Sequence, residues 1–217
     1  MKLNSRKTKC MPYINSKTRD FMPQLRLESE SFLAVIYELK LVGLVLTSDL
    51  QWNTHINYTV TRVNKVIWQL VRFKQLGAPR EKLKTLYILK IRSIIMFGAV
   101  CYHSSLTLEL SKKLEMQQKR CLAVILGTEY RSYSHALSIL NLPRLDQLRE
   151  TASLKWAIKA QQDPKHSNLF RPNTNNTRQN LRFIEPLCRT TKYYKSAIPS
   201  MTRALNQHYR TKNPSPC

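Results

Sequence analysis

Acidic residues are scarce in this chain. Its 217 residues include 13 Asp and Glu against 36 Lys and Arg, which gives a net charge of +23 at pH 7. A folded domain with such an excess of one sign repels itself unless a polyanion neutralises it. The composition therefore favours nucleic acid as the partner, with an anionic membrane surface as the second possibility.

The few aspartates are not clustered. They are Asp20, Asp49, Asp146 and Asp163. Polymerases and nucleases need neighbouring carboxylates to hold two metal ions about 3.5–4 Å apart. Cysteine and histidine pairs with the spacing of a zinc site are also missing, as are the glycine-rich loops that bind nucleotides. We therefore predict no catalytic residue, metal ion or cofactor, and a chain that neither extends a primer nor cuts nucleic acid by itself.

Long apolar runs and a disulfide pattern are missing too. The longest apolar stretch, Ile94 to Tyr102, is far shorter than the roughly 20 residues that span a bilayer, so no transmembrane segment is predicted. The five cysteines are odd in number and scattered, which is typical of reduced thiols. These features favour an intracellular protein, in the nucleus or the cytoplasm, and nothing in the sequence indicates an oligomeric state.

The four glycines punctuate a mainly helical pattern. Gly77 and Gly127 are expected to close helices, Gly98 to lie within one, and Gly43 to lie in the extended run Tyr37–Leu46. Helical spacing of apolar residues predicts five helices, over 53–76, 80–104, 107–126, 134–140 and 144–162.

We predict a mainly α fold, an antiparallel, thumb-like helical bundle preceded by a small β element. The second helix, apolar almost all round in its second half, is expected to be central and buried. The predicted division is a β element over 1–52, the bundle over 53–163, and a basic, partly disordered C-terminal segment over 164–217.

The first predicted helix contains no acidic residue. At 100° per residue its apolar stripe of Ile56, Val60, Val63, Ile67 and Leu70 lies opposite Tyr58, Arg62, Lys65, Gln69 and Arg72. An exposed helix face normally mixes both signs of charge, whereas an all-basic face with a tyrosine suits a phosphate backbone. These five residues are the candidate nucleic-acid-binding site, and the alternative is an ordinary solvated face rich in lysine and arginine.

Several short motifs follow one another in a familiar order. Leu3-Asn4-Ser5-Arg6-Lys7-Thr8-Lys9-Cys10-Met11 resembles motif D of the non-LTR (LINE-type) retrotransposon reverse transcriptases, although Leu3 and Asn4 are adjacent here. Leu41-Val42-Gly43-Leu44-Val45-Leu46 resembles motif E, the primer-grip hairpin, and SDLQWNTHI over 48–56 resembles the entry into the thumb. Segments 91–102, 114–127 and 142–149 resemble later helices of the same region.

This resemblance implies roles for the matching positions. Lys7 resembles the motif D lysine, a proposed proton donor to pyrophosphate, and Gly43 resembles the primer grip and joins the nucleic-acid-binding candidates. Arg62, Lys65 and Arg72 would follow an RNA/DNA template–primer duplex without reading its sequence. The metal-binding aspartates of the palm should precede motif D, so Lys7 has no active site to serve, and the expectation is a truncated, catalytically inactive fragment of an RNA-directed DNA polymerase.

Two alternatives remain open at this point. The chain could be a stand-alone basic helical module that binds nucleic acid in a role of its own. It could also be a peripheral membrane or protein-interaction module built on the basic C-terminal segment, where ten Lys and Arg face one acid, Glu185.

Overall fold

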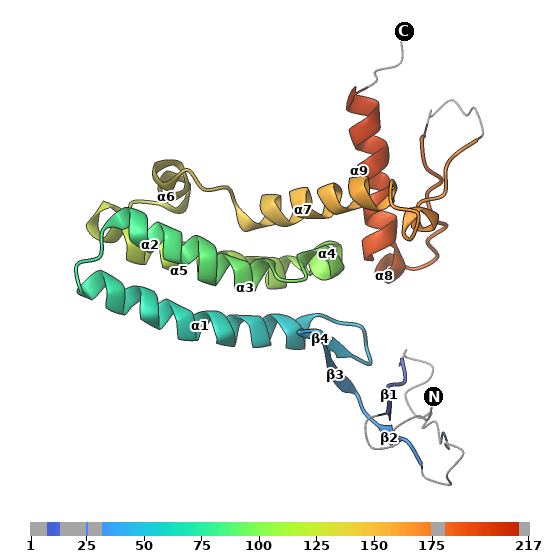
Figure 1. The fold of residues 1–217 in the computed structure, drawn as a ribbon, viewed down its shortest axis with the longest axis horizontal. Coiled ribbons are helices and arrows are strands. Elements are labelled where there is room, and N and C mark those ends of the chain that lie inside the picture. The colour runs from blue at the N-terminus through green and yellow to red at the C-terminus, as the bar shows by residue number, and fades with distance from the viewer. Residues whose placement is uncertain (1–7, 14–24, 26–31, 175–180, 213–217) are drawn as a thin grey trace. The chain divides into compact units, whose positions relative to one another are not determined.

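The computed structural model describes residues 8–13, 25, 32–174 and 181–212 (Figure 1). The chain divides into two compact units, Met1–Thr59 and Val60–Cys217, and each is described by itself. Helices dominate the described residues, so the prediction of a mainly α fold with small strand elements is confirmed. Lys7 lies outside the described residues.

The first unit contains two small pairs of strands. Strands β1 (Lys9–Cys10) and β2 (Ala34–Val35) pair in parallel, and β3 (Glu38–Leu41) and β4 (Leu44–Thr47) form an antiparallel hairpin. The hairpin turns at Val42 and Gly43, both with positive φ, at 47° and 87°. Positive φ at both central residues is the geometry of a type I′ turn, which matches the twist of paired strands. Gly43 is therefore a turn residue, and the single extended run expected through it is wrong.

The hairpin is held against the first turn of helix α1 (Asn53–Gln75). The backbone N–H of Val45 donates to Nδ1 of His55 at 3.3 Å, and the His55 ring meets the edge of Trp52 with centroids 5.8 Å apart. Burial lowers the pKa of His55, which keeps the ring neutral and able to accept this bond. His55 thus joins the strand to the helix.

The long helical segments of the second unit up to Ala160 run alternately in opposite directions (Figure 1). The C-terminal part of α1 is followed by a segment of several short helices, then by a long helix, a short one and another long one. Their bounds are α2 (Arg80–Leu86), the π-helical η1 (Tyr87–Arg92), α3 (Ser93–Met96), α4 (Ala99–Tyr102), the 3₁₀ turn η2 (His103–Ser105), α5 (Leu108–Leu126), the 3₁₀ turn η3 (Gly127–Glu129), α6 (Tyr133–Leu140) and α7 (Leu145–Ala160).

Apolar residues at helical spacing fill the interior of this unit. One stripe on each helix is buried while the opposite side stays in water, as amphipathic helices require. The buried members include Val63, Ile67 and Leu70 of α1, Leu83, Tyr87, Ile91 and Ile95 of the α2–α3 segment, and Leu114, Cys121, Leu122 and Ile125 of α5.

The predicted second helix, 80–104, is not continuous. It breaks at Phe97 and Gly98, where Gly98 takes a left-handed φ of 65°, and the segments Arg80–Met96 and Ala99–Ser105 meet at a bend of 42°. The Tyr102 hydroxyl donates a hydrogen bond to the carbonyl of Ile95, which satisfies an acceptor near the break. The segment is also not buried all round, because Leu89 is 68% exposed.

None of the single helices within the described residues has the length and apolar character to cross a bilayer. The two segments on either side of the Gly98 bend, Arg80–Met96 and Ala99–Ser105, meet the criterion when they are taken as a pair.

The C-terminal segment, predicted to be basic and partly disordered, contains a long helix. The 3₁₀ turn η4 (Ser167–Leu169) and the short helix α8 (Thr191–Tyr194) lead to α9 (Ala197–Lys212). This helix packs against α7, and their contact forms a second core from Ala157, Ala160, Phe170, Phe183, Met201 and Leu205. Residues 175–180, in the predicted linker, lie outside the described residues.

Candidate nucleic-acid interface

The candidate basic face lies on the water-exposed side of α1. Arg62, Lys65, Gln69 and Arg72 are all exposed. They lie opposite Val63, Ile67 and Leu70, whose exposed fractions are 0%, 6% and 0%. The helix forms with this orientation because its apolar residues recur every three or four positions and are drawn into the core. The four side chains therefore share one face, on a helix that carries no carboxylate.

Tyr58 and Gly43, the other two candidates, belong to the first unit. Tyr58 is half-buried, and its hydroxyl accepts a hydrogen bond from Lys40 Nζ at 2.7 Å. The same ammonium lies 4.7 Å from the centre of the Tyr58 ring, a cation–π distance. Lys40 is on β3 and Tyr58 on α1, so this pair ties the hairpin that contains Gly43 to the helix.

Two exposed aromatic residues flank the basic face and were not among the residues singled out in the sequence. Trp68 is 63% exposed and Phe73 is 49% exposed. The Arg72 guanidinium lies 5.5 Å from the Trp68 ring centre, and its Nη1 donates to Gln75 Oε1 at 3.3 Å. The same 100° projection could have found both rings, because each falls about 100° or more from the centre of the apolar stripe.

Helix α5 adds a further cation beside α1. Nη1 of Arg120 donates to Asn64 Oδ1 at 3.0 Å and to Gln117 Oε1 at 3.3 Å. Asn64 lies one turn before Trp68 on α1, so the contact places an exposed arginine along the same edge of the helix. The arrangement offers fixed cations and exposed aromatic rings, the two elements that hold a nucleic-acid strand without reading its sequence.

One arginine does not contribute to any surface. Arg149 of α7 is fully buried, and its Nη2 donates to Ser111 Oγ at 2.8 Å. Burial lowers its pKa, an effect that the nearby Tyr102 and Glu115 oppose. The Arg149 guanidinium is held inside the bundle, out of reach of a polyanion.

A cavity of about 250 Å³ with a mixed polar and apolar lining lies between η2, α7 and α9. Its lining includes His103, Ser104, Glu150, Ser153 and Ser200. Burial and the nearby Arg149 lower the pKa of His103 to about 4, which leaves the ring neutral at physiological pH. Within the described part of the chain, no group of three or more His, Cys, Asp and Glu could hold a metal ion.

Comparison of the chain with protein-family models, with curated proteins and with solved structures found no match.

Proposed function

We propose that this chain holds nucleic acid through the phosphate backbone, using the exposed basic face of α1. The observation that carries the proposal is that Arg62, Lys65 and Arg72 are exposed on one face of a helix without a carboxylate. A polyanion neutralises such a face and gains affinity by releasing its counterions. No base-reading geometry is part of the proposal, so binding should discriminate little between sequences.

We further propose that this activity is the one expected of the thumb region of a non-LTR retrotransposon reverse transcriptase. The order of the motifs in the sequence supports the proposal, as does the type I′ hairpin at Leu41–Leu46, the stretch that resembles the primer grip. The partner would then be an RNA/DNA template–primer duplex. Polymerisation is not part of the proposal, because the carboxylates of a palm are not in this sequence.

The basic C-terminal segment is the rival surface. Two of its arginines already lie over aromatic rings of the chain, Arg182 at 4.2 Å from the centre of Tyr209 and Arg203 at 3.7 Å from that of Tyr194. The apolar side of α9 is also occupied, since Met201 and Leu205 are buried in the second core. The occupied apolar side of α9 argues against its use as a membrane anchor. The sequence of α1, which carries no carboxylate, favours α1 as the phosphate-binding surface.

The experiment compares three charge-neutralised variants of the full chain by titrating a fluorescent duplex at several salt concentrations. The first variant replaces Arg62, Lys65 and Arg72 by Gln, which keeps helix propensity. If all three touch phosphate, the slope of log K against log salt should become shallower by about 3 at most. Circular dichroism should show an unchanged helix content.

Two matched variants remove the same three charges elsewhere. One replaces the exposed lysines Lys112, Lys113 and Lys119 of α5 by Gln, and the other replaces Arg189, Lys192 and Lys195 of the C-terminal segment. Each should change the slope much less than the α1 variant does. Equal changes in all three would mean that net charge alone drives binding, and a change confined to the C-terminal variant would move the site there. Either result overturns the proposal.

A further inference from the structure

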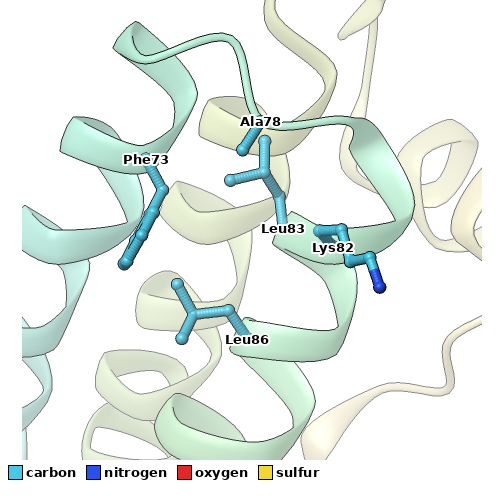
Figure 2. A pocket seen from close by; sticks show the side chains of 5 residues that line it. All are labelled: Phe73, Ala78, Lys82, Leu83 and Leu86. Atoms are coloured by element: carbon cyan, nitrogen blue, oxygen red, sulfur yellow. The ribbon is translucent and has the colours of Figure 1, made fainter.

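A small apolar pocket opens beside the basic face, where α1 ends and α2 begins. Its cavity of about 210 Å³ is lined by Phe73, Ala78, Lys82, Leu83 and Leu86. Figure 2 shows the side chains of Phe73, Leu83 and Leu86 pointing toward one another, whereas the Lys82 ammonium points away from them. The walls are thus hydrocarbon, with one charged group at the rim.

The end of α1 holds this pocket in a defined shape. Gly77 has a φ of 79°, and its N–H donates to the Lys74 carbonyl while the N–H of Ala78 donates to the Phe73 carbonyl, both at 3.0 Å. This pair of bonds is the Schellman motif that ends many helices, in which the residue after the glycine packs near the start of the last turn. The motif brings Ala78 and Phe73, two walls of the pocket, together.

The Phe73 ring stays half exposed beside this hollow. It is 49% exposed, and the neighbouring Leu76 is 82% exposed. Covering apolar surface of this kind is favourable by roughly 25 cal/mol per Å², so the pocket offers binding energy to a flat, apolar group. One charge limits which group that is, because Lys82 stands at the rim.

We propose that the pocket receives one unpaired nucleobase, which stacks on Phe73 while Lys82 holds an adjoining phosphate. The inference rests on the proposed function and deepens it, since it names the strand state of the nucleic acid. A nucleobase joined to a phosphate satisfies both the apolar walls and the cation beside them. An apolar side chain of a partner protein or a second copy of this chain would satisfy only the walls.

The pocket selects unpaired bases without reading their identity. The one polar side chain of its lining is Lys82, and its ammonium points away from the other walls (Figure 2), so no side-chain donor or acceptor is directed at a base edge inside the pocket. Stacking on an aromatic ring, by contrast, is available to every base. The chain should therefore prefer a duplex with a short single-stranded overhang over a blunt duplex, whatever the sequence of the overhang.

The test measures binding of the full chain to a blunt duplex, to the same duplex with a short overhang, and to one whose overhang has abasic sites. All three are compared at one salt concentration by fluorescence anisotropy. The overhang should tighten binding on the order of tenfold, the usual scale of one base stacked on an aromatic ring. The abasic overhang, which keeps the phosphates, should lose most of that gain. A 2-aminopurine in the overhang should lose fluorescence on binding.

Two variants address the pocket itself. Phe73→Ala removes the ring, and Ala78→Leu fills the cavity while keeping the ring. Both should abolish the gain from the overhang, and Ala78→Leu, which keeps the ring, should leave the affinity for the blunt duplex nearly unchanged. Phe97→Ala is the matched control, because Phe97 is similarly exposed, at 47%, and does not line the pocket.

The outcomes separate this inference from the proposed function. If the wild-type chain binds blunt and overhang duplexes equally, the pocket inference is overturned while phosphate binding stands. If the gain survives in both pocket variants, the base binds elsewhere and the inference is likewise overturned. If sedimentation shows dimers that Phe73→Ala dissociates, the pocket holds a second copy. If neither duplex binds at all, the proposed function itself fails.

Discussion

Lys74 of α1 donates a hydrogen bond from its ammonium to the backbone carbonyl of Ile125, in the last turn of α5, at 2.9 Å. The carbonyls of a last helical turn have no partner within the helix, and a cation is favourable there because of the helix dipole. Lys74 thus holds α1 to α5. It differs in this from Arg62, Lys65 and Arg72 on the same helix, which are exposed.

Replacing Lys74 by Met should therefore affect stability and not nucleic-acid binding. Methionine keeps much of the side-chain length but cannot donate to the Ile125 carbonyl. We expect the free energy of unfolding to fall by roughly 1–2 kcal/mol, the scale of a hydrogen bond from a charged donor. Urea unfolding measures this, and the salt slope of binding should stay as in the wild type. Lys119→Met, an exposed control, should change stability by at most about 0.5 kcal/mol.

Gly127 is required both for its backbone conformation and for the place of Lys74. It has a φ of 59°, and a Cβ there would lie 2.7 Å from Lys74 Nζ. Gly77 has a φ of 79°, and a Cβ there would meet nothing within 4 Å. Gly77→Ala should lose about 1–2 kcal/mol from its left-handed conformation. Gly127 combines its positive φ with a ψ of −122°, outside the left-handed helical region, so Gly127→Ala should lose more, both from backbone strain and because it displaces Lys74.

A double-mutant cycle isolates the contact with Lys74. In a Lys74→Ala background the loss of Gly127→Ala should shrink to its backbone part, whereas the loss of Gly77→Ala should stay as it was. The measurement is again the free energy of unfolding in urea. Additive effects of Gly127→Ala and Lys74→Ala would contradict the assigned contact.

Helix ends with local signals were predictable from the sequence. The Thr107 side chain accepts from the N–H of Leu110 at 3.2 Å and caps α5, and Gly127 ends it. The break at Gly98 was not predictable from the sequence, because Ile95 and Ala99 on either side of it keep the helical spacing and both are buried. The spacing of apolar residues indicates which side of a helical segment faces the core. It does not reveal a bend when the same side faces the core before and after it.

The long helix α9 was missed because tertiary contacts stabilise it. Pro199 lies in its first turn, where proline is tolerated but weakens a helical reading of the sequence. Asn206 bonds the backbone of Phe183 in both directions: the N–H of Phe183 donates to its Oδ1 at 2.9 Å, and its Nδ2 donates to the Phe183 carbonyl at 3.0 Å. Asn206 and Phe183 are 23 residues apart, so no local sequence pattern predicts this pair of hydrogen bonds.

The candidate site was predictable in part. The helical projection identified the exposed positions Arg62, Lys65 and Arg72 from spacing alone. It gave no sign that Arg149 is fully buried, because that depends on Ser111 and the helices around it. Phe73 could not be identified as a pocket residue from the sequence of α1, because residues of α2 form the other side of the pocket.

Asn206→Ala should destabilise the second unit strongly. The variant leaves a buried N–H and a buried carbonyl of Phe183 without their partner, and each such group costs on the order of 1–3 kcal/mol. We expect a loss of about 2 kcal/mol or more, measured by urea unfolding. Gln207→Ala, an exposed neighbour on the same helix, is the control and should have little effect. A small loss in Asn206→Ala would show that this pairing does not hold α9 in place.

Val42→Asn should stabilise the β3–β4 hairpin. Val42 has a φ of 47° and is 84% exposed, so the replacement relieves a strained conformation and removes little packing. Asparagine followed by glycine is the preferred pair for a type I′ turn. We expect slower amide exchange in Glu38–Leu41 and Leu44–Thr47. The change should correspond to a gain of up to about 1 kcal/mol in the stability of the hairpin. Faster exchange would indicate a different turn.

The stability of the second unit should fall as the pH drops from about 6.5 to 4, through His103. Its pKa is lowered to about 4, first by burial and then by the charge of Arg149, and Asp146 opposes the shift. Over this window the unfolded chain, with an ordinary pKa of 6.5, binds a proton that the folded chain does not, so the free energy of unfolding decreases with falling pH. The stabilisation that depends on His103 is full above pH 6.5 and is lost by about pH 4. It amounts to at most about 3 kcal/mol in the free energy of unfolding.

His103→Gln tests this, because glutamine does not titrate in that range. Urea unfolding of the variant at several pH values between 7 and 4 should show a shallower decline than the wild type. Some slope should persist, since burial also lowers the pKa of His55 and acts in the same direction. The Nδ1 atom of His103 is buried without a hydrogen-bond partner, which is why protonation inside the fold is unfavourable. Parallel pH profiles for the two proteins would show that His103 is solvated in the folded chain.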